Sequence, residues 1–310
     1  MIIYTDLHNR TKNYTLSEDI KQEINKKFNV QIVTTINSKA EVYWGDKLTN
    51  EHLTKMPNLK WIHFGGIGID KVLKMNRNII VTNSKGTMEE ALASSSLSLI
   101  FSLSRCINQC YDLRYKNNLT RNSMNKYFNK LQDVFGQTIL IVGCGSVGKK
   151  VSSVCEVLNM NVIKLISKDD VNLLPEMVKD SDFVLNLLPY TNETKSIFNK
   201  KVFENMQKTS YFINVGRGET VVEEDLIEAL KNKSIAGAGL DVFEKEQKLP
   251  KSPLSEDSSL WNMNNVIITP HIAGWSKNYW KKQIDLFGEN LKRYKNSEEM
   301  LNIINLNRGY

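Results

Sequence analysis

The stretch Ile139–Gly148 reads ILIVGCGSVG and decides the fold of the chain around it. Its first four residues, ILIV, form an apolar run that predicts a buried strand. The run stops at Gly143, where a G-x-G-x-x-G pattern begins. The next ten residues carry apolar side chains at helical spacing, namely Val151, Val154, Cys155 and Leu158. The glycine pattern therefore stands between a predicted strand and a predicted helix, which is the context that a dinucleotide-binding turn requires.

Each glycine of this pattern has a separate physical role in such a turn. Gly143 permits the tight turn, Gly145 lets a pyrophosphate approach the backbone, and Gly148 lets the helix pack closely on the sheet. The free N–H groups and the positive end of the helix dipole then hold the phosphates. The flanking strand and helix favour this interpretation over the alternative, a glycine-rich turn with a structural role only.

The bulk properties are those of a globular protein with two domains. The chain has 310 residues, of which 41% are hydrophobic and 24% are charged, and this length suffices for two cores. No apolar run approaches the ~20 residues of a membrane span. The first residues, MIIYTDLHNR, are typical of an opening strand and not of a signal peptide. The four cysteines form no C-x-x-C pair, which is typical of a reducing compartment, so we expect a cytoplasmic protein.

Neither a metal site nor a nucleic-acid interface is predicted. Cys106 and Cys110 have a spacing that could serve a metal, but no second pair accompanies them, and we interpret them as core residues. The formal net charge is +7. The lysines are scattered, without a block of five or more, and no nucleic-acid module is recognisable. The positive charge is therefore interpreted as a solvated surface, with a mild field toward anionic ligands as the alternative.

The first 82 residues alternate between short strands and helices, which predicts a small parallel-sheet domain. Residues 17–28 have helical spacing, with Ser17 as the N-cap. The glycines of the loop His63–Asp70 leave backbone amides exposed, and such amides either form an anion-binding nest or belong to a flexible turn. The predicted strands are Ile2–Tyr4, Gln31–Thr34, Ala40–Trp44, Trp61–His63 and Ile79–Thr82.

A long helix is predicted over Thr87–Ile107, and a polar surface segment or arm over Lys116–Phe135. A second α/β unit then begins with the strand at Ile139. Together with that strand, five further short apolar runs predict a doubly wound parallel sheet. These runs are Asn161–Ile166, Phe183–Leu187, Tyr211–Asn214, Ile235–Leu240 and Val266–Thr269.

Chemically active side chains follow three of these strands. Arg217 follows YFINV, Asp241 and Glu246 follow IAGAGL, and His271 follows VIIT. Each has an ordinary alternative: a surface arginine, a solvated acidic loop or a structural histidine. Because open α/β sheets bind ligands at the carboxyl ends of their strands, we expect the cation, the carboxylate and the imidazole to meet at one edge.

The motifs G-x-G-x-x-G, NVGRG, LDVFEKE and TPHIAG, in this order, resemble the D-isomer-specific 2-hydroxyacid dehydrogenase family. The resemblance includes NLLPYTNETKSIFN and the closing NLNRGY, and thus nearly the whole chain. It implies an α/β fold with two doubly wound parallel-sheet domains. A Rossmann cofactor domain, residues 93–276, would be inserted into a flavodoxin-like substrate domain, residues 1–92 and 277–310. Family members are commonly homodimers, and Lys116–Phe135 is our candidate contact.

The resemblance also implies a reaction, hydride transfer between a nicotinamide and C2 of a small 2-keto or 2-hydroxy acid. His271 would donate the proton to the carbonyl oxygen, and Glu246 would fix the tautomer of its ring and favour imidazolium. Arg217 would contact both the substrate carboxylate and the carbonyl oxygen. The amides around Gly66, Ile67 and Gly68 would bind the rest of the carboxylate.

We expect the protein to prefer NADPH over NADH as its cofactor. NAD-specific members carry an acidic residue about 18–20 residues past the last glycine of the loop, where it bonds the ribose hydroxyls. This chain has Ser167 and Lys168 in that region, and these side chains suit a 2′-phosphate. Asp241 would receive the nicotinamide amide. The other expected cofactor contacts are Gly143, Gly145, Ser146, Val147, Gly148, Leu188, Pro189, Val215 and Gly216.

The substrate stays open among glyoxylate, hydroxypyruvate and longer 2-keto acids, with Trp44, Phe64 and Trp275 as candidate pocket side chains. Two alternatives compete with this activity. A formate dehydrogenase would pair the histidine with glutamine, and Glu246 argues against that. A nucleotide-sensing corepressor or scaffold on the same fold would bind the cofactor without turnover. The chain departs from the family pattern at two points: no proline follows Glu246 directly, and Ser94 stands where many members have an acid.

Overall fold

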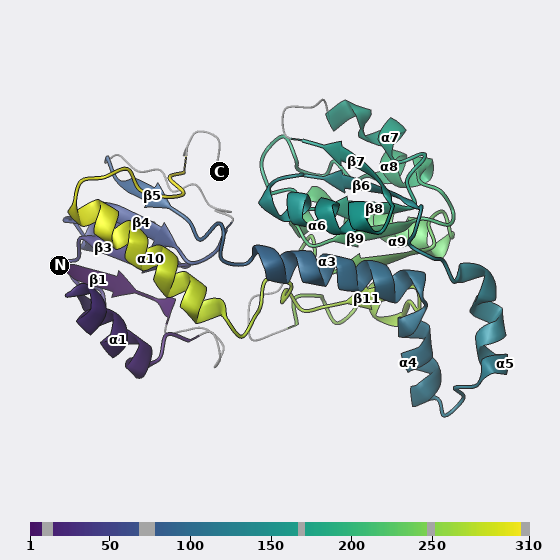
Figure 1. Cartoon of the computed structure of the whole chain (residues 1–310), viewed down its shortest axis with the longest axis horizontal. Helices are drawn as coiled ribbons and strands as arrows, with labels where there is room; N and C mark the ends of the chain where they lie inside the picture. The colour runs from purple at the N-terminus through teal and green to yellow at the C-terminus, as the bar shows by residue number, and fades with distance from the viewer. Residues whose placement is uncertain (8–14, 68–77, 167–170, 247–251, 305–310) are drawn as a thin grey trace. The chain divides into compact units, whose positions relative to one another are not determined.

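The computed structural model describes residues 1–7, 15–67, 78–166, 171–246 and 252–304. The chain divides into two compact units (Figure 1). Unit 1 comprises Met1–Met88 and Ser276–Tyr310, and unit 2 comprises Glu89–Trp275. Among the described residues, no helix is both long enough and apolar enough to cross a membrane.

Unit 1 is built on a five-stranded sheet in which all described neighbours are parallel. The strand order is β2-β1-β3-β4-β5, so the chain first adds a strand on one side of β1 and then crosses to the other side. This order is that of a doubly wound, flavodoxin-like sheet. The strands are β1 (Ile2–Thr5), β2 (Gln31–Val33), β3 (Val42–Gly45), β4 (Trp61–Phe64) and β5 (Ile80–Thr82).

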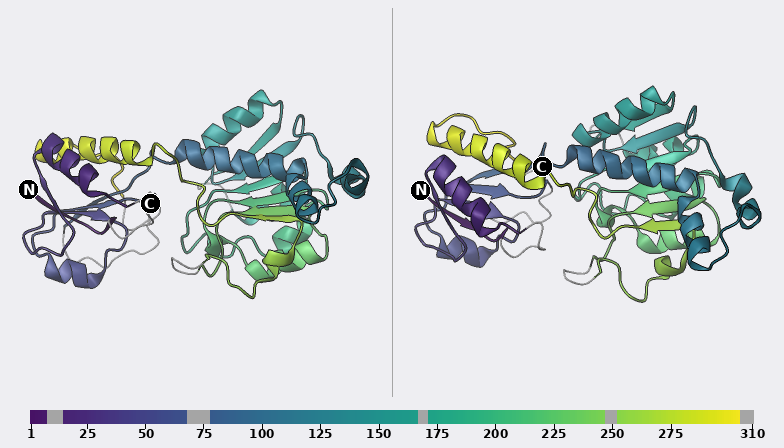
Figure 2. Two further views of the ribbon diagram at one scale, coloured as in Figure 1. Left: turned by 90° about the horizontal axis from the view of Figure 1, so that it is seen from below. Right: turned by 60° about the horizontal axis from the view of Figure 1, so that its bottom comes forward.

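Helices cover both faces of this sheet (Figure 2). On one face lie α1 (Glu18–Phe28) and α10 (Tyr279–Lys295), which share a core cluster with residues of β1, β3 and β4. On the other face lies α2 (Asn50–Lys55), whose Leu53 packs in a second cluster. The side chain of Ser17 accepts a hydrogen bond from the N–H of Ile20, which confirms Ser17 as the N-cap of α1.

The structure contradicts one prediction for unit 1, that Trp44 lines a substrate pocket. Trp44 has no exposed surface. Its ring stacks on Phe287 of α10, with ring centroids 4.1 Å apart and planes 9° apart. Because the C-terminal helix returns to cover this face of the sheet, the indole is part of the core. Phe64 and Trp275 are partly exposed.

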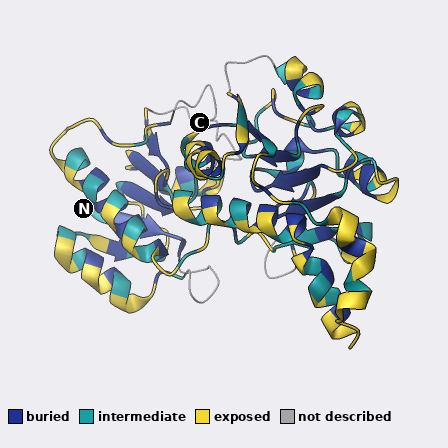
Figure 3. Cartoon of the chain, turned by 45° about the vertical axis from the view of Figure 1, so that its right-hand side comes forward, coloured by how far each residue is buried: buried dark blue, intermediate teal, exposed yellow. Residues whose placement is uncertain are grey.

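Unit 2 is built on a six-stranded sheet, and again every described pair is parallel. The strand order is β11-β10-β9-β8-β6-β7. The central strands β6, β8, β9 and β10 are almost entirely buried, whereas the edge strands β7 and β11 are partly exposed (Figure 3). All six strands match the predicted apolar runs within two residues at either end. They are β6 (Thr138–Val142), β7 (Asn161–Leu165), β8 (Phe183–Asn186), β9 (Tyr211–Asn214), β10 (Gly237–Leu240) and β11 (Val266–Ile268).

Two core clusters show that helices cover both faces of this sheet as well. The first cluster joins one face to α3 (Glu89–Ser104) and α6 (Ser146–Val157). The second joins the opposite face to α7 (Leu174–Met177), α8 (Lys200–Asn205) and α9 (Glu223–Lys231). Short 3-10 turns complete the unit, namely η3 (Asn125–Lys130), η4 (Val171–Leu173), η5 (Gly218–Thr220) and η6 (Ser259–Asn262). The two sheets confirm the predicted fold class.

The helix predicted over Thr87–Ile107 corresponds to α3, which runs from Glu89 to Ser104 and so ends before the predicted boundary. Cys106 then adopts a left-handed conformation with φ 53°. A left-handed residue cannot continue a right-handed helix, so α4 (Ile107–Tyr115) starts in a new direction (Figure 1). Cys106 itself is buried with Leu113 and Tyr127, which confirms that it is a core residue. The predicted surface segment 116–135 contains α5 (Arg121–Met124) and η3.

Candidate functional site

The three glycines of ILIVGCGSVG stand at the point in unit 2 where the sheet reverses its winding. The chain leaves β6 for β7 on one side and reaches β8 on the other, and ligands of open α/β sheets bind at such a switch point. Gly143 has φ 91°, a conformation that L side chains rarely adopt. A Cβ at Gly148 would lie 3.2 Å from Ile141 of β6, so Gly148 permits close packing of α6 on the strand.

Gly145 differs from these two glycines because a Cβ there would meet nothing within 4 Å. It is the N-cap of α6, and Ser146 and Val147 form the first turn of that helix. The N-terminal amides of a helix attract anions through their unpaired N–H groups and the helix dipole. The described residues thus provide open space and an anion-attracting helix end at the same point.

The loops after β8 and β9 lie directly beside this turn. Gly216 packs against the backbone of Leu188, since a Cβ at Gly216 would lie 2.7 Å from the Leu188 carbonyl oxygen. Leu188 and Val215 are buried, whereas Pro189 is exposed. A Cβ at Gly143 would in turn lie 3.0 Å from the Leu188 nitrogen. The predicted cofactor contacts after β6, β8 and β9 are therefore neighbours in space.

A buried amide pair, which the sequence interpretation missed, joins the loops after β8 and β9. Asn186 and Asn214 end their strands side by side, and Asn186 Nδ2 donates to Asn214 Oδ1 over 3.0 Å. Asn186 Oδ1 accepts from the N–H of Leu188, and Asn214 Oδ1 accepts from the N–H of Gly216. The signal in the sequence is that each of two apolar runs, FVLN and YFIN, ends in an asparagine. A polar side chain at the end of a buried strand needs hydrogen-bond partners.

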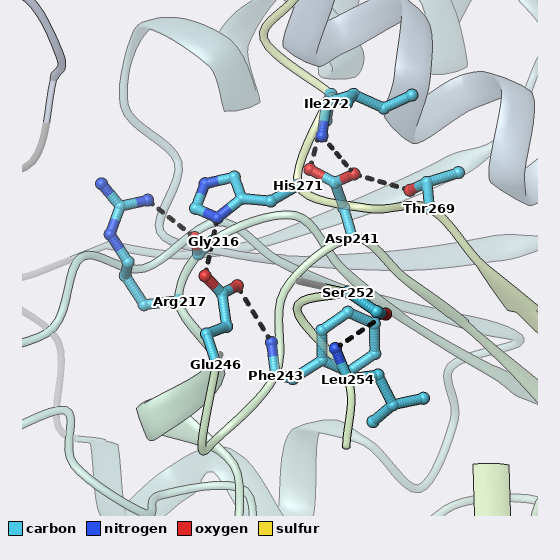
Figure 4. A network of polar contacts seen from close by, with 11 residues as sticks. Gly216, Arg217, Asp241, Phe243, Glu246, Ser252, Leu254, Thr269, His271 and Ile272 are labelled. Atoms are coloured by element: carbon cyan, nitrogen blue, oxygen red, sulfur yellow. Dashed lines mark hydrogen bonds and ion pairs between the residues drawn. The ribbon is translucent and has the colours of Figure 1, made fainter. Parts of the chain in front are cut away.

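The structure brings Arg217, Glu246 and His271 together (Figure 4). His271 Nδ1 lies 2.9 Å from Glu246 Oε2, and the His271 side chain is 47% exposed. Glu246 Oε1 accepts a hydrogen bond from the N–H of Phe243. Arg217 donates from Nη1 to the Gly216 carbonyl over 2.8 Å, and its guanidinium lies beside the imidazole. A cation, an imidazole and its acidic partner thus share one site.

The charges around His271 set its protonation. The hydrogen bond that His271 donates to Glu246 raises the pKa of His271, partial burial lowers it, and the charge of Glu246 raises it again. Arg217 lowers the pKa and Asp241 raises it, with a net shift above the ordinary value. Since Nδ1 faces Glu246, Nε2 is the ring atom left to hold a transferable proton. The arrangement is that of a general acid oriented and charged by a carboxylate.

Asp241 holds the loop that carries His271. Its carboxylate is buried, 1% exposed, and accepts from the Thr269 hydroxyl at 2.6 Å and from the N–H groups of Ile272 and Ala273 at 2.9 Å. His271 itself has φ 54°, and its N–H donates to the carbonyl oxygens of Asp241 and Thr269. A left-handed conformation in a residue with a side chain is strained, and these bonds maintain it. That Asp241 contacts the nicotinamide amide stays a prediction.

The remaining predicted residues are placed elsewhere or lie outside the described chain. Gly66 and Ile67 belong to unit 1 and are partly exposed. Gly68, Ser167 and Lys168 lie outside the described residues. Within the described ranges, no group of three or more His, Cys, Asp and Glu side chains could hold a metal ion.

Residues 97–273 match the family model for the NAD binding domain of D-isomer specific 2-hydroxyacid dehydrogenases. The chain is 32% identical over 260 residues to a glyoxylate reductase of Thermofilum pendens, which covers 79% of this chain and 75% of that protein.

Solved structures resemble both units of the chain. A D-lactate dehydrogenase from Aquifex aeolicus, solved with NAD and lactic acid, superposes with a TM-score of 0.78 at 25% identity over 96% of each chain. An NADPH-dependent glyoxylate/hydroxypyruvate reductase from Sinorhizobium meliloti, solved with NADP and sulfate, has a TM-score of 0.80 at 22% identity. It covers 100% of this chain and 99% of its own, and at that identity the likeness concerns the fold alone.

Proposed function

Because the chain belongs to the D-isomer specific 2-hydroxyacid dehydrogenase family, we propose that it reduces a small 2-keto acid of the glyoxylate or hydroxypyruvate class with NADPH. Membership makes the chain an NAD(P)-dependent oxidoreductase that transfers a hydride between the cofactor and a 2-keto or 2-hydroxy acid. The curated relatives are named as reductases and dehydrogenases. They give no support to the alternative, a nucleotide-sensing corepressor without turnover.

The glycine turn supports a dinucleotide in unit 2. The open space at Gly145 and the N-terminus of α6 suit a pyrophosphate, and the loops at Leu188 and Val215 suit the rest of the cofactor. When bound, the nicotinamide supplies or accepts the hydride. The protein's own residues then have to orient the substrate and move one proton.

The proton is the task that we assign to His271. In reduction, its Nε2 donates to the oxygen of the substrate carbonyl, whose carbon receives the hydride, and the product is a hydroxyl group. The contact between Glu246 and Nδ1, at 2.9 Å, stabilises the imidazolium before the transfer and fixes which nitrogen faces the substrate. This contact is the single observation that carries the proposal, because a nucleotide sensor has no need of an oriented acid.

The second task, polarising and orienting the substrate, falls to Arg217. Its permanent charge and planar fork suit a carboxylate together with the adjacent carbonyl oxygen. Its backbone is held by hydrogen bonds to its carbonyl oxygen from the Thr220 hydroxyl at 2.6 Å and from Asn214 Nδ2 at 3.4 Å. The next residue, Gly218, packs tightly on Phe243. We propose that the amides of Gly66, Ile67 and Gly68 bind the substrate carboxylate as well.

The preference for NADPH rests on the sequence after β7. Ser167 and Lys168 suit a 2′-phosphate, and an acidic residue at that place would repel it. The measurement is kcat/KM for NADPH and for NADH with one keto acid. A clear preference for NADH would overturn this part of the proposal. It would indicate that Asp169 or Asp170 bonds the ribose hydroxyls instead.

The activity itself is tested with a panel of 2-keto acids, by following the oxidation of NADPH. We expect turnover with glyoxylate or hydroxypyruvate and a D-2-hydroxy acid as product. Cofactor binding without turnover on any 2-keto acid would favour the sensor and overturn the proposed function. Chiral analysis of the product separates the D-specific reaction from an unspecific reduction.

We also propose that the protein is a cytoplasmic homodimer. All four cysteines are free thiols, as expected in a reducing compartment. Apolar side chains are exposed on α4 and in the segment that follows it, among them Tyr115 at 84% and Phe128 at 71%. Exposed apolar patches of this kind mark protein contacts.

A further inference from the structure

Residues 64–67, at the end of β4 and the start of the loop that follows it in unit 1, have each of their four carbonyl groups hydrogen-bonded to the protein interior. The donors are side chains or backbone groups of two segments, residues 83–84 and α10. The Ser84 hydroxyl donates to Phe64 O (2.8 Å), Gln283 Nε2 to Gly65 O (3.1 Å), Ser84 N–H to Gly66 O (3.0 Å) and Asn83 Nδ2 to Ile67 O (2.6 Å). The described start of the loop, residues 64–67, is thus held from one side.

The donors at Ser84 and Gln283 belong to a buried network that reaches back to β4. His63 has no exposed surface, and burial lowers its pKa to about 3, so the ring stays neutral. Its Nδ1 lies 2.7 Å from the Thr82 hydroxyl, which also accepts from Trp61 Nε1 at 2.8 Å. The Thr82 hydroxyl thus links the rings of Trp61 and His63 in the interior.

From Nε2 the network continues to the loop. His63 Nε2 lies 3.3 Å from the Ser84 hydroxyl, and that hydroxyl lies 2.9 Å from Gln283 Oε1. With its oxygen facing Ser84, the Gln283 amide presents its NH₂ group to Gly65 O and to the Thr87 hydroxyl, both at 3.1 Å. One glutamine, 1% exposed, therefore connects the buried histidine to the loop backbone. The single proton of the Ser84 hydroxyl serves both Phe64 O and Gln283 Oε1. Buried hydrogen-bonded networks of this kind rigidify what they hold.

Peptide geometry then fixes the opposite side of the loop. In a trans peptide the carbonyl of one residue and the N–H of the next point in opposite directions. Because the Gly65 carbonyl faces Gln283, the N–H of Gly66 points away from Gln283. Because the Gly66 carbonyl faces the Ser84 backbone, the N–H of Ile67 points away from Ser84. Two successive amides are directed outward from the network in a partly exposed loop, which is the arrangement that binds an anion.

We propose that Gln283, supported by Ser84 and His63, is the positioning residue that holds the amides of Gly66 and Ile67 ready for the carboxylate of the substrate. Gln283 touches neither substrate nor cofactor and acts through the backbone of the loop. The inference rests on the proposed function, because it takes a 2-keto acid as the ligand of these amides. It adds the device that preorganises them and predicts which kinetic constant that device controls.

The test is Gln283→Met, which keeps the length of the side chain and removes its hydrogen bonds. The carboxylate is bound equally in the ground state and in the transition state, so loss of order in the loop weakens uniform binding. We expect KM for glyoxylate and Ki for oxalate to rise about tenfold, with kcat changed less than about twofold and the Kd of NADPH unchanged. Ser84→Ala is the second variant. The rise in KM and Ki of the double variant should be only slightly larger than that of the more affected single variant, because both substitutions act on one network.

Gln109→Met provides the matched control. Gln109 is also a buried glutamine, 5% exposed, whose amide caps a backbone carbonyl, that of Asn264 in unit 2. The Gln109→Met substitution should change Tm but neither KM nor Ki. If folded Gln283→Met and Ser84→Ala have unchanged KM and Ki, or if only their Tm is lowered, the inference is overturned and the proposed function still stands. An inactive wild-type enzyme would overturn both, so the two failures are distinguishable.

Discussion

His271 Nδ1 lies 2.9 Å from the Glu246 carboxylate, although the two residues are 25 positions apart in the chain. The carboxylate is oriented in turn, since its other oxygen accepts from the N–H of Phe243. The contact therefore specifies both the charge and the tautomer of the ring. The kinetic consequences of this pair are the first to be tested.

Replacing His271 by Asn should abolish most of the turnover. Asparagine keeps a polar group of similar size but cannot deliver a proton at neutral pH. General acid catalysis by a positioned side chain contributes ~10²–10⁴-fold, so we expect kcat for keto-acid reduction to fall by about that factor. The Kd of NADPH, measured by fluorescence, should stay close to that of the wild type. Near-normal kcat in His271→Asn would remove His271 as the acid.

Keto-acid reduction should fall as the pH rises through the pKa of His271. The hydrogen bond with Glu246 raises that pKa, so the protonated form extends to higher pH than in an isolated histidine. Glu246→Gln removes the charge, and the fall in kcat/KM should move to lower pH. The free energy of unfolding should depend on pH in the same direction. Below the pKa of His271 in the unfolded chain, about 6.5, protonation of His271 contributes its full stabilisation of the fold. This contribution is lost as the pH rises through the raised pKa of the folded state. An identical pH profile in Glu246→Gln would contradict this account.

Arg217→Lys should separate charge from geometry at the second catalytic position. Lysine retains the positive charge but loses the planar fork that fits a carboxylate and a carbonyl oxygen together. We expect kcat/KM to fall about 10²-fold in Arg217→Lys and further in Arg217→Ala, because a donor to developing charge is worth ~10²–10³. Added guanidinium should restore part of the activity of Arg217→Ala. Equal activity of the lysine variant and the wild type would exclude the fork as the relevant feature.

Asp241→Asn tests whether this buried carboxylate acts on the histidine loop or on the cofactor. The carboxylate accepts three hydrogen bonds from the loop, and an amide NH₂ at one of its oxygens would face a donor. Loss of the charge should shift the pH profile to lower pH in either case. If the role of Asp241 is to hold His271 at φ 54°, kcat should fall with the Kd of NADPH unchanged. A weaker Kd with kcat close to that of the wild type would instead support the predicted contact with the nicotinamide amide. Thr269→Ser, which keeps the hydroxyl, is the conservative control.

The strands and the order of the site motifs were predictable because both depend on local sequence. Buried parallel strands read as apolar runs, and the ends of such runs locate Arg217, Asp241 and His271 at the carboxyl edge of the sheet. What depends on distant segments was not predictable. The sequence predicts Trp44 as a pocket side chain, and only the return of α10 makes it a core residue beside Phe287.

Local conformation caused a second discrepancy. Apolar spacing continues from α3 through Cys106, so the pattern gives no sign of the left-handed residue that ends the helix. The partners of Asp241 were likewise invisible, since its three donors lie in a loop that begins 28 positions later. Hydrophobic periodicity describes which side chains are buried, whereas loop conformation and polar pairing depend on contacts made after the fold has formed.

The predicted homodimer can be tested on α4, which directly precedes the candidate contact Lys116–Phe135 and has three apolar side chains four residues apart on one face. Ile107, Tyr111 and Tyr115 are 42%, 53% and 84% exposed, a large apolar stripe for a surface helix. A charge in the middle of this stripe would be desolvated in a dimer and solvated in a monomer. Tyr111→Asp should therefore shift the mass measured by light scattering from dimer to monomer, without a change in the circular dichroism spectrum. Ile303→Asp in unit 1, at a side chain 52% exposed, should leave the mass unchanged. A monomeric wild type would exclude the dimer, and a Tyr111→Asp variant that stays dimeric would move the contact away from α4.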